Sequence, residues 1–160
     1  MFSKYQINIY QIIFGLIVLT IGALVYIIDR QNIYFVKYFN ISFYGKISNI
    51  FGNFGNSFPD FIHPFAFIII TAGLFSLNKR KLLFISILWL SFDVLMELGQ
   101  KYNNIALLFI PDFFDNIPFL ENSKNYFIHG TYDEIDIFAI FLGAGSAYIM
   151  SYNFNKSSNI

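Results

Sequence analysis

Long apolar blocks alternate with shorter polar stretches along this chain, and four of the blocks are long enough to form membrane-spanning helices. The first block, residues 9–28, contains only Gln11 and Thr20 as clearly polar members, and about 20 apolar residues suffice to cross the hydrocarbon of a bilayer. Three more helices are expected at about 58–77, 82–100 and 132–152. The pattern therefore predicts an all-α polytopic membrane protein, a four-helix transmembrane bundle formed by a single domain over residues 1–160.

The first block is expected to remain as a helix rather than to be removed as a signal peptide. Lys4 precedes it, as in a signal peptide, but the apolar core of a signal peptide is only about 7 to 15 residues long and leads into small residues. Here a longer block is followed by Asp29, Arg30 and Gln31. We therefore interpret the block as a retained transmembrane helix.

Two longer connections separate the predicted helices. Residues 29–57 are rich in Tyr and Phe, which suit a membrane interface, but they follow neither helix nor strand periodicity and their structure stays open. Glycines and asparagines within residues 45–56 indicate a flexible lead-in to a helix that starts at Ser57-Phe-Pro-Asp60. In the second connection, residues 101–130, the apolar segment 105–110 is too short to span a membrane and is expected to lie in the interface or fold back onto the bundle.

Polar side chains of the third predicted helix fall on one stripe. Asp93, Glu97 and Gln100 occur at i, i+4 and i+7, and Trp89 and Ser86 extend the stripe backwards in three- and four-residue steps. A carboxylate facing the centre of a bilayer costs about 2.5 to 3.5 kcal/mol on insertion scales. The stripe is therefore expected to face the interior of the bundle, where other polar groups meet it.

Two other predicted helices carry polar groups that could meet this stripe. In the second, Asp60 precedes His63 by one turn, although a single histidine on an apolar helix more often has a structural role. In the last, Asp133 and Asp136 lie at the start, where acidic side chains cap a helix and offset its dipole, which suffices to explain Asp133. Asp136 lies one turn deeper and shares its face with small residues that let helices approach closely in lipid, namely Ala139, Gly143 and Ala147.

The distribution of basic residues predicts which side of the membrane these groups face. With four helices, Lys4, the tight basic turn Asn78–Lys81 and Lys156 fall on one side, and none of the ten acidic residues does. The other side holds both long connections, with basic and acidic residues mixed. The basic, acid-free side, with both termini, is therefore expected in the cytoplasm. The polar groups of three helices then converge at the extracytoplasmic side. The candidate site residues are Asp60, His63, Asp93, Glu97, Gln100, Asp133 and Asp136.

Specific contacts are expected within this group. The small face of the last helix should pack against the third helix and bring Asp136 near Glu97, with His63 close enough to join them. Asp93 and Glu97 are like charges one turn apart, so one of them is expected to be protonated unless a cation lies nearby. We expect a charged His63 to pair with Glu97, or a metal ion to take its place.

Composition supports the membrane assignment and excludes several other classes. The chain is 56% hydrophobic and 12% charged, whereas soluble domains carry about 25% charged residues. Its formal net charge of zero gives no general attraction to nucleic acid. It has no cysteine, so disulfides, thiolate catalysis and thiolate metal sites are excluded.

Three short motifs in order resemble those of VanZ-like membrane proteins. They are Asp60-Phe-Ile-His63, Glu97-Leu-Gly-Gln100, and Asp136-Ile-Phe-Ala139 followed by Gly143, and the resemblance covers about residues 57–150. The chain departs from the family's pattern at Phe61, where many members have Lys, near Gly130, where many have Arg, and at Ile140, where many have Asn. The resemblance implies a small helical bundle with an envelope role, such as binding or shielding against glycopeptide or lipoglycopeptide molecules.

Other functions stay open at this stage. A membrane hydrolase or transferase acting on a lipid-linked head group could use His63 as acid or base beside Glu97, and carboxylates with one His could hold a divalent metal. A proton or ion path is favoured less, because the polar groups form one level rather than a ladder across the bilayer. The cluster could also serve only to fix the packing of the bundle. The bilayer is the expected partner, and the sequence identifies no cofactor, ligand or oligomeric state.

Overall fold

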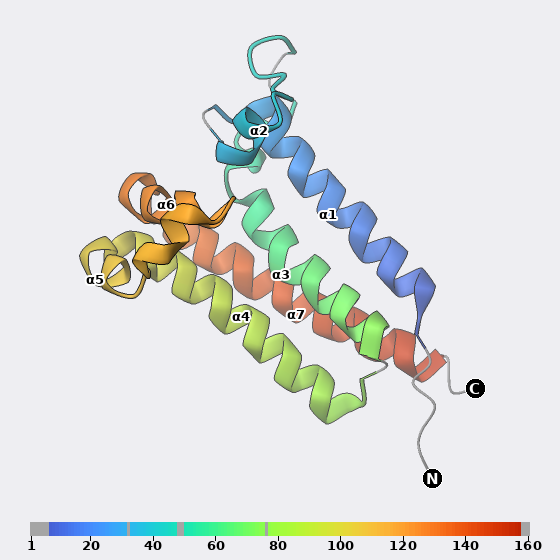
Figure 1. The fold of residues 1–160 in the computed structure, drawn as a ribbon. Helices are drawn as coiled ribbons and strands as arrows, with labels where there is room; N and C mark the ends of the chain where they lie inside the picture. Colours follow the sequence, from blue (N-terminus) through green and yellow to red (C-terminus); the bar gives the residue numbers. More distant parts are fainter. Residues whose placement is uncertain (1–6, 32, 48–49, 76, 158–160) are drawn as a thin grey trace.

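Four long helices dominate the computed structural model, which describes residues 7–31, 33–47, 50–75 and 77–157 (Figure 1). They are α1 (Ile9–Asp29), α3 (Phe54–Phe75), α4 (Lys79–Lys101) and α7 (Glu134–Ser157). Each is long and apolar enough to cross a membrane. In the described residues the only β pairing is an isolated bridge between Tyr44 and Ile47. The predicted all-α polytopic bundle is confirmed.

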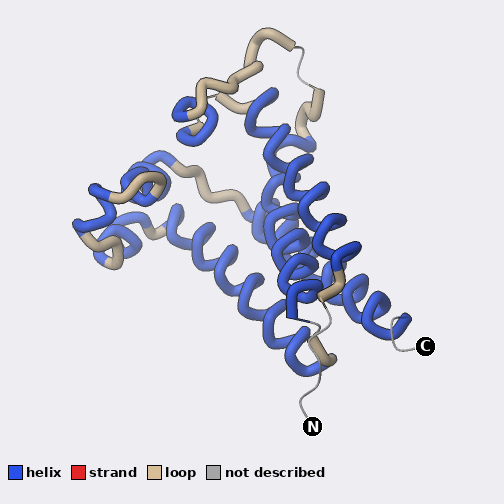
Figure 2. The backbone as a smooth tube through the Cα atoms, turned by 45° about the vertical axis from the view of Figure 1, so that its right-hand side comes forward, coloured by secondary structure: helices blue, strands red, loops and turns tan. Residues whose placement is uncertain are grey.

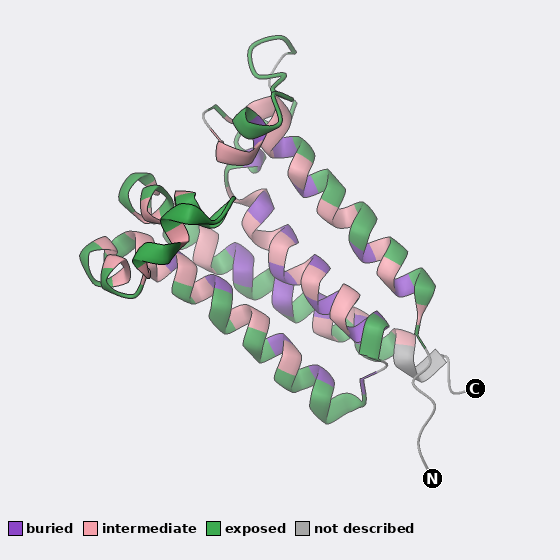
Figure 3. Cartoon of the chain, in the orientation of Figure 1, coloured by how far each residue is buried: buried purple, intermediate pink, exposed green. Residues whose placement is uncertain are grey.

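α3 is the central helix of the bundle. It packs against α1, α7 and α4, and α4 also packs against α7. α1 and α4 lie on opposite sides of α3 in both views (Figures 1 and 2). Buried positions run along the sides of the helices that face their neighbours, while the outer faces are exposed (Figure 3). A polar contact also links α1 to α7, because Gln11, fully buried, donates a 3.0 Å hydrogen bond to the Ser151 hydroxyl.

The two ends of the bundle differ in what they carry. One end, called the turn end below, holds the Asn78 turn and the described ends of the chain, where the Asn8 N–H donates to the Gly73 carbonyl at 2.8 Å (Figure 1). The opposite loop end holds α2 (Tyr34–Tyr38), α5 (Asn103–Leu108) and α6 (Ser123–His129). Lys4 and the side chain of Lys156, used above to predict orientation, lie outside the described residues.

The small face of α7 packs most closely on α3, whereas α4 was the expected partner. A Cβ built on Gly143 would lie 2.2 Å from the backbone oxygen of Phe61 in α3. Ala139, Ala144 and Ala147 are buried beside this crossing. The two backbones can approach this closely only because Gly143 has no side chain.

The helices α3 and α4 begin earlier than predicted. α3 starts at Phe54, so Gly55 and Asn56 are helical rather than part of a flexible lead-in, and Ser57 lies inside the first turn. α4 starts at Lys79 because Asn78 caps it, accepting a 3.0 Å hydrogen bond from the Lys81 N–H. The basic residues of the predicted turn therefore form the first turn of α4.

The connections at the loop end are mostly short helices. Two 3-10 helices, Asp112–Asn116 and Leu120–Asn122, separate α5 from α6. The connections meet where Phe119 contacts the rings of Tyr34, Tyr38 and Phe39, with centroid distances of 6.2, 5.2 and 6.0 Å. Phe119 has a φ of 70°, which is unfavourable for a bulky residue. We call the four rings of Phe119, Tyr34, Tyr38 and Phe39 the aromatic clasp.

Candidate functional site

The polar stripe of α4 faces the interior of the bundle, as predicted. Ser86, Asp93 and Glu97 are buried, and Asp93 and Glu97 are only 8% and 4% exposed. The Ser86 hydroxyl donates to the Leu82 carbonyl of its own helix at 2.9 Å. The two carboxylates, by contrast, reach groups on other elements, and they are the part of the stripe that can form a site.

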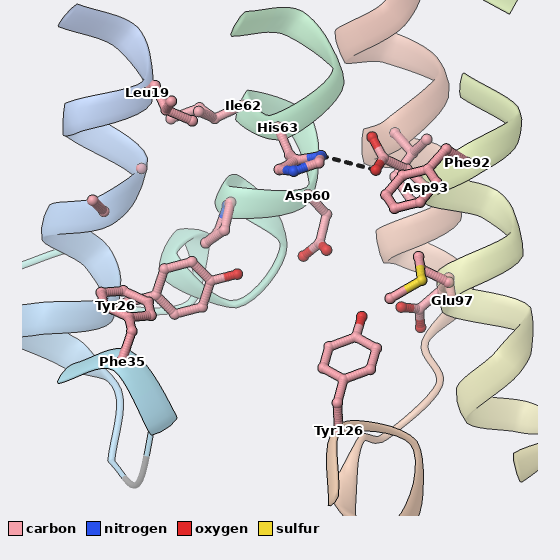
Figure 4. Close-up of a pocket in the computed structure, with 15 residues that line it drawn as sticks. Leu19, Tyr26, Phe35, Asp60, Ile62, His63, Phe92, Asp93, Glu97 and Tyr126 are labelled. Carbon is pink, nitrogen blue, oxygen red and sulfur yellow. Dashed lines mark ion pairs between the residues drawn. The ribbon is translucent and has the colours of Figure 1, made fainter. Parts of the chain in front are cut away.

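A cavity of about 380 Å³ lies between α1, α3 and α4, with α6 at its loop end (Figure 4). Its deeper wall is apolar and includes Leu19, Ile62 and Phe92. The part nearer the loop end is polar. Side chains there point into the space between the helices (Figure 4), and they are Tyr26, Asp60, Glu97 and Tyr126.

His63 pairs with Asp93 across this cavity, and the expected pair with Glu97 is wrong. His63 Nδ1 lies 2.8 Å from Asp93 Oδ1 (Figure 4). The helices run in opposite directions, so at 1.5 Å per residue His63 lies roughly 14 Å from the start of α3 and Asp93 roughly 12 Å from the end of α4. Glu97 lies only roughly 6 Å from that end. His63 therefore lies at the same depth in the bundle as Asp93, and Glu97 lies too close to the end of α4 to pair with it.

The His63–Asp93 pair is buried on one side and open on the other. The Asp93 side chain is 9% exposed, whereas the His63 side chain is 41% exposed and lines the cavity. The imidazole also contacts Phe67, at a centroid distance of 4.5 Å, and Trp89, at 6.1 Å. These contacts fix the ring beside the carboxylate, so a ligand in the cavity would meet an oriented imidazole.

Glu97 connects three elements at the loop end. Its Oε1 accepts a 2.9 Å hydrogen bond from the Asp133 N–H, and its Oε2 accepts one of 3.2 Å from Gln100 Nε2. Gln100 Nε2 also donates to the Tyr126 hydroxyl at 2.8 Å. Asp133 caps α7, accepting a 2.8 Å bond from the Ile135 N–H. Gln100 and Asp133 thus act through Glu97 and do not line the cavity.

Asp136 lies near enough to Glu97 for their charges to interact, but outside direct hydrogen-bond contact. Over the described residues no direct hydrogen bond joins Asp136 to Glu97 or to His63. The Ser57 side chain hydrogen-bonds to the Asp136 carboxyl group, while Asp136 Oδ1 is buried without a partner among those residues. Because α7 packs on α3, Asp136 faces the start of α3 and lies outside the cavity lining.

Arg30 is a cation that sequence reasoning missed. Its Nη2 donates to the Gly55 carbonyl at 3.1 Å and also to the Asn56 carbonyl, and its guanidinium lies 5.2 Å from the Tyr26 ring centre. Pro59 has no N–H to give to the carbonyl four residues earlier, which leaves Gly55 free to accept from Arg30. The sequence did contain a signal for this contact. It has a proline inside one helix and a basic residue just beyond the end of the preceding helix.

Two tyrosines of the cavity were also missed. Tyr26 lies near the end of α1, and Tyr126 belongs to α6, which carries no sequence signal for a polar site. Burial raises the pKa of Tyr126 to about 12, so its hydroxyl stays protonated near neutral pH. It can donate a hydrogen bond into the cavity while accepting one from Gln100.

The described side chains that meet at the cavity are a histidine, three carboxylates and two tyrosines. No group of three or more His, Asp or Glu residues among them is arranged to hold a metal ion. Asp60, His63, Asp93 and Glu97 are the four sequence-predicted residues that the structure brings to one cavity. No protein family model, curated protein or solved structure matches this chain.

Proposed function

We propose that this protein is a VanZ-like envelope protein whose cavity binds an amphiphilic molecule at the outer leaflet of the cell membrane. The observation that carries the proposal is the two-part lining, apolar at Leu19, Ile62 and Phe92 and polar at Asp60 and Glu97. A ligand with an alkyl chain and a polar head matches both parts. Pockets of this kind, mostly apolar with a few convergent polar groups, are typical of small-molecule sites.

The proposed orientation rests on the charges at the two ends of the bundle. Lys79, Arg80 and Lys81 are exposed at the turn end, whereas the loop end mixes basic residues such as Lys124 with acidic ones such as Asp112 and Asp115. Because the cytoplasmic side is typically basic, we assign the basic, acid-free turn end and both termini to the cytoplasm. The polar part of the cavity then lies in the outer half of the membrane.

The envelope role follows from the VanZ-like resemblance. The first motif contributes Asp60 and His63 to the cavity, and the second contributes Glu97. The proposed ligands are lipid-linked or lipid-tailed envelope molecules, including those of the glycopeptide and lipoglycopeptide type. The protein would bind such a molecule, or shield the membrane against it.

Susceptibility to a lipoglycopeptide, measured in a susceptible bacterial host, tests this role. Ala23 lines the cavity, so Ala23→Leu should fill part of it and reduce protection while leaving abundance unchanged. Ile17→Phe is the control, because Ile17 lies on the outer face of the same helix and is 55% exposed. Equal protection by the parent and by Ala23→Leu, at equal abundance, would exclude the cavity as the functional site.

A membrane enzyme is the second candidate, favoured by the His63–Asp93 pair. A carboxylate hydrogen-bonded to one imidazole nitrogen orients the ring and leaves the other nitrogen to act as acid or base. The reaction would be hydrolysis of, or transfer from, a lipid-linked head group. Under this alternative His63→Gln abolishes turnover of such a substrate and retains its binding, whereas a binding protein shows no turnover in either form.

A further inference from the structure

We infer that the cavity selects an amphiphile with a cationic, amine-bearing head and rejects one with a phosphate head. The inference rests on the proposed binding of an amphiphile and narrows its chemical class. It is carried by the charges facing the cavity, by the oxygen acceptors that line it, and by the position of its apolar wall.

The charged groups that line the cavity are mainly acidic. Three carboxylates, those of Asp60, Asp93 and Glu97, face one imidazole, that of His63. The His63 imidazole is already paired with the Asp93 carboxylate. Arg30 does not line the cavity and donates to the backbone carbonyls of Gly55 and Asn56. Its positive charge still acts on Asp60, so Glu97 and Asp60 together exceed it by one negative charge when both are ionised.

In their ionised form, Asp60 and Glu97 would attract an ammonium group and would repel a phosphate. Charge interactions are several times stronger at a partly dry site than in water. A cationic head would also relieve the repulsion between carboxylates that share the cavity.

The polar part of the cavity is lined by oxygen acceptors from Asp60, Glu97, Tyr26 and Tyr126. Asp93 Oδ2 is not among them, because it is buried and closed to the cavity. The Asp60 carboxylate points into the cavity between the hydroxyl groups of Tyr26 and Tyr126 (Figure 4). An ammonium has three donors and no acceptor, so its hydrogen-bonding needs match a wall rich in carboxylate and phenol oxygens.

The apolar wall indicates where the alkyl chain would lie. Leu19 on α1 lies deeper than the carboxylates, and Phe92 on α4 lies at the height of Asp93 (Figure 4). α1 and α4 flank α3 on opposite sides, and Phe92 is 47% exposed. An alkyl chain lying along the exposed side of Phe92 would extend from the cavity towards the acyl chains of the bilayer, with its head at Asp60 and Glu97.

Three probes with the same dodecyl chain test the inference on the full-length protein in a nonionic detergent: dodecylamine, dodecyl phosphate and dodecanol. Trp89 is the only tryptophan in the chain and its ring is 6.1 Å from that of His63, so its fluorescence reports binding, with the melting temperature as a second readout. We expect saturable dodecylamine binding at least about tenfold tighter than that of the other two probes, which corresponds to about 1.4 kcal/mol.

Two variants and one control locate the effect. Asp60→Asn should weaken dodecylamine binding about tenfold, and Glu97→Gln provides a second test if the first variant does not fold. Asp112→Asn removes the same charge from a fully exposed side chain at the loop end and should leave binding unchanged. Loss of binding in Asp112→Asn equal to that in Asp60→Asn would overturn the inference, since overall charge would then explain it.

The remaining outcomes separate this inference from the proposed function. Suppose that dodecyl phosphate or dodecanol binds as tightly as dodecylamine and that Ala23→Leu abolishes this binding. The preference for a cationic head would then be wrong, whereas the proposed binding of an amphiphile would be retained. If no probe binds saturably, both the inference and the proposed function are overturned.

Discussion

The Glu97 carboxylate accepts a 2.9 Å hydrogen bond from the backbone N–H of Asp133, which ties the end of α4 to the start of α7. Its other oxygen accepts from Gln100. The same side chain lines the cavity. Glu97 therefore has a structural contact and a position in the candidate site, and the two roles can be separated by substitution.

Replacing Glu97 by Gln and by Ala should give different losses of stability. Glu97→Ala leaves the Asp133 N–H without its acceptor, and a hydrogen bond to a charged group contributes about 1.5 to 3 kcal/mol. Glu97→Gln retains an acceptor oxygen and should cost less. Thermal unfolding in detergent compares them, and equal melting temperatures for Ala, Gln and parent would show that the contact does not stabilise the bundle.

Gly143→Ala should strongly destabilise the packing of α7 on α3. The added Cβ would lie 2.2 Å from the Phe61 backbone oxygen, which cannot rotate away, and overpacking of this kind costs about 1 to 3 kcal/mol. Gly145→Ala is the matched control, because its Cβ would meet nothing within 4 Å and alanine favours the helix by up to about 1 kcal/mol. Melting temperatures should fall for the first variant and hold or rise for the second. The reverse order would contradict the packing described here.

Loss of the aromatic clasp should loosen the loop end without unfolding the four long helices. Phe119→Ala removes the ring that contacts Tyr34, Tyr38 and Phe39 but leaves an unfavourable positive φ for an alanine. Hydrogen exchange should accelerate in α2 and α6, with little change in α3. Phe113→Ala serves as the control, because Phe113 is 60% exposed and its recorded ring contact is with the adjacent Phe114. Unchanged exchange in Phe119→Ala would show that the clasp does not hold the connections together.

Alkaline pH should destabilise the loop end through Tyr126. Its pKa in the folded protein is about 12, above the ordinary value of 10.0, so the folded state binds this proton more tightly than the unfolded state. The stabilisation is complete below pH 10 and is lost as pH rises towards 12. Tyr126→Phe should show a smaller fall in melting temperature over that range. A fall as steep as in the parent would assign the alkaline loss to other groups.

Accessibility to a membrane-impermeant thiol reagent should distinguish the two ends of the bundle in intact cells. The chain has no cysteine, so single cysteines can be placed freely. Asn53→Cys and Asn122→Cys at the loop end should react from outside, and Asn78→Cys at the turn end should not. The expectation follows from the basic residues beside Asn78. The opposite labelling pattern would reverse the topology and move the cavity to the cytoplasmic leaflet.

The sequence alone was sufficient for the number of long helices, their approximate ends and the inward direction of the α4 stripe. The lipid environment explains this, because a spanning helix needs about 20 apolar residues and a carboxylate facing acyl chains is costly. Asp93 and Glu97 at four-residue spacing had to share a face, and that face had to be buried. The small residues around Gly143 likewise had to mark a close helix crossing, whichever helix lay opposite.

Only the tertiary structure decided which groups meet. Periodicity places a side chain on a face but does not fix its height relative to the next helix, and one turn corresponds to about 5.4 Å. The relative height of α3 and α4 places His63 beside Asp93 rather than beside Glu97. Because α3 is the partner of Gly143, Asp136 meets Ser57 of α3 rather than hydrogen-bonding to Glu97. The short helix α6 brings Tyr126 to the cavity. These contacts depend on helix order, relative depth and the path of the connections, none of which the hydrophobic pattern specifies.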